Sequence, residues 1–309
     1  MDEMNKVTGE LLKEVSDWTD DSTKSAYNIR QDGGCAGRRS TENIKIESKT
    51  DNPGINIYIS GKTAGESVYI PACITHAGVD DLVYNDFYVE DGADVIIIAG
   101  CGVHSDGEEE AHHNGIHRFF IGKNANVVYR EKHLGSGKGR GQKNINPVTD
   151  CKIGENAYME MDTAQIGGVT KSERKTVATL EAGARLVIRE RLLTDNSESA
   201  KSFYDISLDG EDSGVDLVSR SVAKGDSVQG YHSIIKGNCK CTGHSECDAI
   251  LADNGKVTAI PELYAGDLDA SLIHEAAIGK IAGEQIIKLR TLGLTEEEAE
   301  RKIIDGFLR

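Results

Sequence analysis

The sequence contains no long apolar run. Its strongest apolar stretch, residues 95–99, is far shorter than the roughly twenty residues that a bilayer-crossing helix needs. Residues 1–6 lack the basic-then-apolar order of a secretion signal, so we expect a cytoplasmic location. Basic charge is also scarce, because 35 Lys and Arg face 51 Asp and Glu and leave a net charge of −16. Nucleic acids and anionic membranes bind basic surfaces, so we expect neither as a partner.

Proline and aromatic residues are rare, with four prolines and 5% aromatics, whereas glycine occurs 34 times. Many glycines without a proline-rich tract indicate tight turns rather than disorder. The seven cysteines are an odd number, and without a secretion signal we expect reduced thiols. A nucleotide-binding P-loop is missing too, because the glycine-rich stretch 135–141 holds no Gly-Lys followed by Ser or Thr. We interpret that stretch as a flexible loop and do not expect the chain itself to hydrolyse ATP.

Short β-type runs fill the middle of the chain. A turn Gly, a small residue and a β-branched run recur at positions 93, 125, 157, 184 and 215, with gaps of 32, 32, 27 and 31 residues. Such a period is typical of a stacked solenoid, in which neighbouring coils bury an inner face together. The pattern favours a parallel β-helix with charged residues such as Arg130, Glu160 and Arg189 facing outward. A β-sandwich would show the same alternation and stays an alternative.

Helical segments are expected at both ends of the chain. Residues 1–30 predict a short arm, because the apolar residues of 2–18 fall on one helix face. The β-helix core is assigned to 31–262 and a helical segment to 263–309. Within that segment 270–292 favours a helix, and Thr295–Glu298 form a capping box. The last helix has an apolar face and would either cap the solenoid end or dock a partner.

The strongest candidate chemistry lies in residues 243–251 and 271–276. Glu246 and Asp248 flank Cys247, and His244 is close by. These polar neighbours predict partial exposure of the thiol and suit a metal or a sulfur species. His274 and Glu275 follow in the expected tail helix, where adjacent residues point in different directions.

Two further groups are weaker candidates. Cys239 and Cys241 extend Cys247 into a C-x-C-x5-C arrangement, which differs from the paired C-x2-4-C of closed zinc sites. A histidine cluster comprises His104, His112, His113 and His117. On a helix two of these could bind zinc, but Asn-Gly at 114–115 breaks a helix and 116–121 is typical of a strand. Packing between coils is therefore favoured over a metal site.

Several segments together resemble the SufB/SufD family, the scaffold proteins of the SUF iron–sulfur cluster assembly system. They are Asp81–Phe87, Val95–Asp106, Gly115–His117, Gly243–Asp248, Ile273–Ala276 and Leu292–Ala299. The resemblance runs from about residue 40 to the end. It implies a right-handed parallel β-helix with helical ends, a scaffold rather than an enzyme, and an ABC-type ATPase partner contacted through the C-terminal helices. It also implies that two chains pair through the end of the β-helix and hold a transient iron–sulfur cluster there.

The family's S-x-C-D and H-E-A motifs map onto Cys247 and Glu275, with His274 adjacent, as the implied cluster- and sulfur-binding residues. Secondary candidates are Cys239, Cys241 and His244. Only about 40 residues precede the resemblance, so a sulfur relay in a longer N-terminal region is not expected, and a homodimer is favoured. The sequence identifies no sulfur donor, and a flavin, although possible in this family, is not readable from the residues.

Two other classes of function stay open at this point. One is a β-solenoid enzyme acting on carbohydrate or transferring acyl groups, although no pair of acids stands out from the turn acids. The other is a purely structural interaction protein, which would need none of Cys247, His274 and Glu275. Metal analysis of anaerobically purified protein would separate the three.

Overall fold

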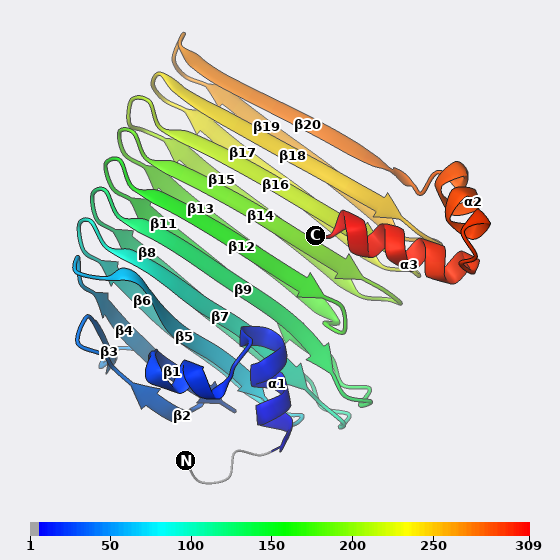
Figure 1. Cartoon of the computed structure of the whole chain (residues 1–309), viewed down its shortest axis with the longest axis horizontal. Helices are drawn as coiled ribbons and strands as arrows, with labels where there is room; N and C mark the ends of the chain where they lie inside the picture. Colours follow the sequence, from blue (N-terminus) through cyan, green and yellow to red (C-terminus); the bar gives the residue numbers. More distant parts are fainter. Residues whose placement is uncertain (1–5) are drawn as a thin grey trace.

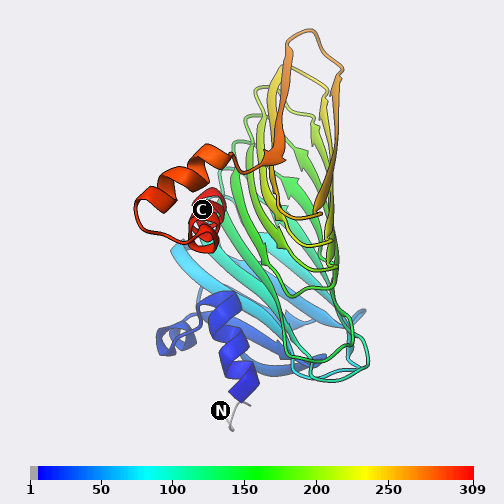
Figure 2. The same ribbon diagram turned by 90° about the vertical axis from the view of Figure 1, so that its right-hand side faces the viewer.

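The computed structural model describes residues 6–309 as a β-solenoid of about eight turns with short helices at its ends (Figure 1). Each coil places one strand in one long sheet, sheet A, and the next strand in a facing one, sheet B. Figure 2 shows the two sheets nearly edge-on, stacked along the solenoid axis. The expected parallel β-helix is therefore confirmed over the β-sandwich.

Sheet A contains, in spatial order, β2 (Gly34–Arg39), β1 (Ala26–Gln31), β5 (Ala64–Ile74), β7 (Asp94–His104), β9 (Asn126–Ser136), β12 (Tyr158–Ile166), β14 (Arg185–Thr194), β16 (Gly214–Ala223), β18 (Cys241–Leu251) and β20 (Ala270–Lys280). Sheet B contains β3 (Ile44–Ser48), β4 (Gly54–Ile59), β6 (Asp80–Val89), β8 (Ala111–Ile121), the pair β10 (Lys143–Ile145) and β11 (Val148–Ile153), β13 (Lys171–Leu180), β15 (Ser199–Leu208), β17 (Val228–Gly237) and β19 (Lys256–Ala265). Pro147 separates β10 from β11, because proline has no N–H for the sheet.

The repeat has a backbone cause in the turn that leads into sheet A. In successive coils a residue with positive φ precedes a small buried residue: Gly92, Asn124, Asn156, Gly183 and Asp212 have φ of 72°, 55°, 56°, 66° and 59°. Glycine, asparagine and aspartate tolerate this left-handed conformation best. The small residue that follows, such as Ala93 or Ala125, fits inside the coil with at most 2% exposure. The sequence motif therefore marks a tight corner of the solenoid.

Alternation along each strand builds the core. In β8 every second residue is buried, and the same inward positions stack from coil to coil. Phe87 and Phe119 lie face to face with ring centroids 4.4 Å apart. Arg130 and Arg189 are exposed and Glu160 is half-buried on the outer face, as predicted. Each coil thus shares its inner face with its two neighbours.

The N-terminal end of the solenoid is covered. Helix α1 (Lys6–Ser16) packs Leu11 and Leu12 against Ile29 and Cys73, and the antiparallel pairs β1–β2 and β3–β4 close the first coil. The predicted helical arm is present as α1 and the short 3-10 helix η1 (Asp20–Lys24), but β1 occupies the end of the 1–30 segment. The part of the predicted helix before residue 6 lies outside the described residues. None of the helices in 6–309 has the length and apolar character needed to cross a bilayer.

The C-terminal end differs from the prediction. Residues 270–280 form strand β20, which pairs with β18 along its whole length, so the helix expected over 270–292 is wrong for this part. Sheet pairing outweighs the helix propensity of its alanines and glutamate. The helices are α2 (Gly283–Thr291) and α3 (Glu296–Phe307), and the predicted capping box at Thr295 is present. Helix α3 lies alongside sheet A, so it does not cap the solenoid end (Figures 1 and 2).

Candidate functional site

Two neighbouring parallel strands of sheet A, β18 and β20, carry the main predicted site residues. Their register places Ser245 beside His274, Glu246 beside Glu275, and Cys247 beside Ala276. Because side chains alternate between the two faces of a strand, the register sorts these residues into an inner and an outer group.

The inner group is Ser245, Cys247 and His274. The Tyr231 hydroxyl lies 2.8 Å from Ser245 Oγ, and His274 Nδ1 lies 3.2 Å from the same oxygen. Cys247 is only 1% exposed. Burial, helped by the charges of Glu190 and Asp248, raises the pKa of its thiol to about 12. The predicted partial exposure of Cys247 is wrong, because its polar neighbours 246 and 248 point outward while the thiol points into the core.

The outer group is His244, Glu246 and Glu275. Each offers one ligand atom, and these three atoms lie within 4.8 Å of one another. His244 Nδ1 is 2.8 Å from Asp216 Oδ1 of β16, and His244 Nε2 is 3.8 Å from Glu275 Oε2. The hydrogen bond with Asp216 raises the pKa of His244. Partial burial and the neighbouring Asp248 raise the pKa of Glu246.

Cys247 and Glu275 therefore face opposite sides of sheet A. Within one chain the thiol shares its face with His274, and Glu275 shares its face with His244. A cluster ligated by both Cys247 and Glu275 would need a rearranged β20 or a second chain.

The secondary cysteines lie at the other end of β18. Cys241 starts that strand, so it lies about 20 Å from Cys247 at the usual rise of a strand. Cys239 precedes it in the turn, with Sγ 3.5 Å from the carbonyl oxygen of Leu208. Burial raises the pKa of both thiols. These two cysteines form a separate group from the one around Cys247.

The interior of the N-terminal half contains buried charges that the sequence analysis missed. Asp81 accepts hydrogen bonds from Arg30 and contacts His113 at 3.0 Å. Burial alone would raise the pKa of this carboxyl, but the bonds with His113 and Arg30 outweigh it and hold the pKa well below its usual value. The period-2 burial of β8, which sends His113 inward, was the available signal.

A second buried group follows two coils further on. Arg174 Nη1 lies 2.7 Å from Glu131, which also accepts a hydrogen bond from Tyr129. Although burial opposes ionisation, Arg174 and His133 hold the pKa of Glu131 well below its usual value. His117 contacts the Tyr129 hydroxyl at 2.8 Å, and burial lowers the pKa of this histidine to about 4. The inward histidines thus have protein partners, which favours packing over a metal role for that cluster.

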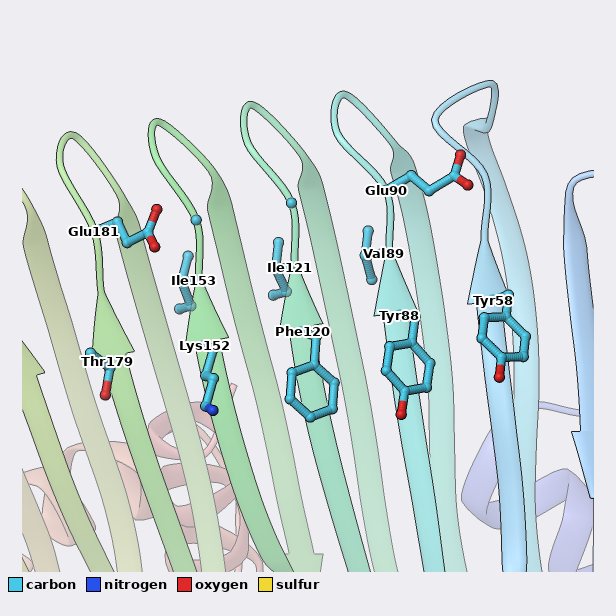
Figure 3. A pocket seen from close by; sticks show the side chains of 12 residues that line it. Tyr58, Tyr88, Val89, Glu90, Phe120, Ile121, Lys152, Ile153, Thr179 and Glu181 are labelled. Atoms are coloured by element: carbon cyan, nitrogen blue, oxygen red, sulfur yellow. The ribbon is translucent and has the colours of Figure 1, made fainter. Parts of the chain in front are cut away.

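A hollow of about 640 Å³ lies on the outer face of sheet B, away from these residues. Figure 3 shows Tyr58, Tyr88 and Phe120 in a row, continued by Lys152 and Thr179. The rings stack on one another with centroids 5.1 Å apart, and Lys152 Nζ lies 5.6 Å from the Phe120 ring. Stacking between coils accounts for this row.

The fold and these residues define a two-sheeted parallel β-solenoid with a buried thiol and an outer imidazole–carboxylate group near its last coil. Residues 84–307 match the family described as SUF system FeS cluster assembly, SufBD core domain. An iron–sulfur cluster assembly SufBD family protein of Archaeoglobus fulgidus is 30% identical over 262 residues, covering 84% of this chain and 69% of that protein. Another of that description, from Methanothermobacter thermautotrophicus strain Delta H, is 29% identical, covering 81% of this chain and 62% of that protein.

The chain belongs to the SufBD family. Membership suggests a role in iron–sulfur cluster assembly, with partner proteins of the SUF system in general. It also implies that iron and sulfur are involved.

Proposed function

We propose that this chain is a scaffold on which iron–sulfur clusters are assembled and passed on. In this proposal Cys247 is the principal sulfur ligand, the cluster forms where two copies of the chain meet, and an ABC-type ATPase drives its release. The observation that carries the proposal is the position of Cys247 and His274 on the last two sheet A strands of a SufBD-family solenoid.

The uncovered last coil supports the pairing of two chains. The outer edges of β19 and β20 pair with no other strand among residues 6–309. Their large apolar side chains are exposed, with Ile260 at 50%, Leu263 at 40% and Ile273 at 53%. An edge strand with exposed apolar residues is a template for association with another chain. A second copy would cover this end and close the surroundings of His274.

The buried thiol needs a change of state before it can act. At a pKa of about 12 it is protonated at neutral pH, whereas the thiolate is the nucleophile and the metal ligand. Ligating iron would release the proton. Accepting sulfur from a donor persulfide would form Cys247–S–SH and leave the donor as a thiolate. Because a buried thiol reacts slowly, the scaffold would have to open to load or release a cluster.

The C-terminal helices offer a route for such opening. None of the residues of α2 is buried, and Ile287 and Leu292 are 61% and 74% exposed. Only residues 281–282 separate α2 from β20. A partner that grips α2 would therefore pull directly on the strand that carries His274 and Glu275. This geometry suits an ATPase whose dimerisation shifts the scaffold between closed and open states.

Anaerobic reconstitution with iron and sulfide tests the ligand assignment. We expect Cys247→Ala and Glu275→Ala to lose most of the cluster absorbance, while Cys101→Ala, a buried thiol in an earlier coil, keeps it. Unchanged absorbance in both of the first two variants would overturn the assignment.

Co-purification with the ABC-type ATPase tests the partner. Deletion of residues 283–309 removes both helices and leaves β20 intact, so binding should be lost while the solenoid stays folded by circular dichroism. Retained binding would refute docking through the helices.

A further inference from the structure

The outer group formed by His244, Glu246 and Glu275 has the composition of a cation site. We propose that it binds a divalent cation, and that within the proposed scaffold function this cation is the incoming ferrous iron. The inference rests on the proposed function for the identity of the metal, but the geometry of the site does not.

Two carboxylates face each other across β18 and β20 without a basic partner of their own. Glu246 and Glu275 are directly paired in the register, and like charges in such a position repel each other. No Lys or Arg nitrogen lies within 4.0 Å of either carboxylate among residues 6–309; the one ion-pair partner is His244, near Glu275. A bound cation would offset this repulsion.

The histidine is already oriented toward the two acids. Asp216 lies at Nδ1 of His244, at 2.8 Å, which leaves Nε2 on the side of Glu275. A carboxylate behind an imidazole is the usual support for a metal-binding histidine, because it fixes the ring and raises its basicity. Asp216 comes from β16, so three successive strands of sheet A build the group.

The spacing needs only small side-chain movements. The three ligand atoms lie within 4.8 Å of one another, whereas atoms bound about 2.1 Å from one ion are at most about 4 Å apart. Rotation of the glutamates is possible because Glu275 is exposed and Glu246 half-buried.

One imidazole and two carboxylates, without a thiolate, suit borderline and hard divalent ions such as Fe²⁺ and Mn²⁺. The soft thiol of Cys247 lies on the opposite face of the same sheet. Iron would thus be held by nitrogen and oxygen ligands outside the solenoid, separated from the sulfur ligand by one layer of backbone. The two components would meet only when β20 moves.

Anaerobic Fe²⁺ titration of the chelator-treated full chain, followed by equilibrium dialysis and metal analysis, tests the site. We expect one Fe²⁺ per chain in the wild type and at least tenfold weaker binding in His244→Ala and in Glu246→Gln. Asp216→Asn should weaken binding about tenfold, as expected for a positioning residue. Co²⁺, as a spectroscopic substitute, should show visible absorption that changes in Asp216→Asn.

His232→Ala is the matched control. His232 lies 2.6 Å from Glu262 on sheet B, a histidine–carboxylate pair with no second acid in a grouping of three. Its removal should change Fe²⁺ affinity less than twofold. No stoichiometric Fe²⁺ in the wild type, meaning only an ionic contact of His244, would overturn the inference, as would undiminished binding in His244→Ala/Glu246→Gln.

Cys247→Ala separates this inference from the proposed function. It should keep the Fe²⁺ site and lose cluster formation. Loss of Fe²⁺ binding in this variant would place the iron at the thiol and refute the outer site. Fe²⁺ binding in a wild type that forms no cluster would instead refute the scaffold function and leave the metal site standing.

Discussion

The two ends of the solenoid are built differently. At the N-terminal end, α1 and two antiparallel strand pairs cover the first coil, and the buried charges behind them are paired, as Arg174 is with Glu131. At the C-terminal end nothing within the described residues covers β19 and β20, and inward side chains such as Leu263 and His274 are partly exposed. A solenoid needs a cap at each end to exclude water. The contrast indicates that the N-terminal end is finished within the chain, whereas the other end is left for an interaction.

The largest expected effect comes from the sealed half. Arg174→Met removes the guanidinium that Glu131 faces at 2.7 Å and leaves that carboxylate buried. Breaking a buried ion pair in this way costs about 3–5 kcal/mol in free energy of unfolding. Arg130→Met, one residue before Glu131 on the exposed outer face, should change it by less than about 0.5 kcal/mol. Urea denaturation compares the two; equal stabilities would contradict the role given to this buried group.

Next in size is the packing of the N-terminal cap. Leu12 of α1 is fully buried, and Leu12→Ala should cost about 3 kcal/mol, within the range for core leucines. Leu268→Ala, at the uncovered end where the side chain is fully exposed, should cost less than about 0.5 kcal/mol. Thermal unfolding at low protein concentration measures both. If Leu268→Ala destabilises the monomer as strongly, the C-terminal end is not open in solution.

Acid should weaken the sealed half through His117. Its pKa is about 4 in the folded chain because of burial, against about 6.5 when unfolded. Between these two values the unfolded state binds the extra proton, so stability falls as the pH drops from about 6.5 to 4, by roughly 3 kcal/mol in total. His117→Gln should flatten the pH dependence in that window. An unchanged slope would mean that other buried groups, such as Glu131, dominate it.

The smallest effect on folding, and the largest on assembly, is expected at the open end. Leu263→Lys places a charge on the exposed part of β19 and should change monomer stability by less than about 0.5 kcal/mol. Since a lysine on an edge strand blocks pairing with another chain, it should convert the proposed dimer to monomer. Sedimentation velocity distinguishes the two species. A dimer that persists would place the interface elsewhere.

The sequence predicted the solenoid because its repeat arises from a local turn. The left-handed corner and the small residue after it, as at Asn124 and Ala125, are visible in every coil without long-range information. Strand β20 was predicted as a helix because its composition is helical and only its partner β18 decides otherwise. The same limitation applies to the site. Motif matching selected Cys247 and Glu275, but only the register shows that they lie on opposite faces.

Coil length changes along the axis. Asp94 pairs with Asn126 and Asn126 with Tyr158, offsets of 32 residues, whereas Arg185 pairs with Gly214 and Cys241 with Ala270, offsets of 29. Three residues fewer shorten the circumference by roughly 10 Å at the usual rise of a strand. The solenoid is therefore a taper, narrowest toward the end that carries Cys247. Two such tapers joined tip to tip would form an hourglass, and a cluster at its waist would lie close to solvent on every side, a short distance from any acceptor.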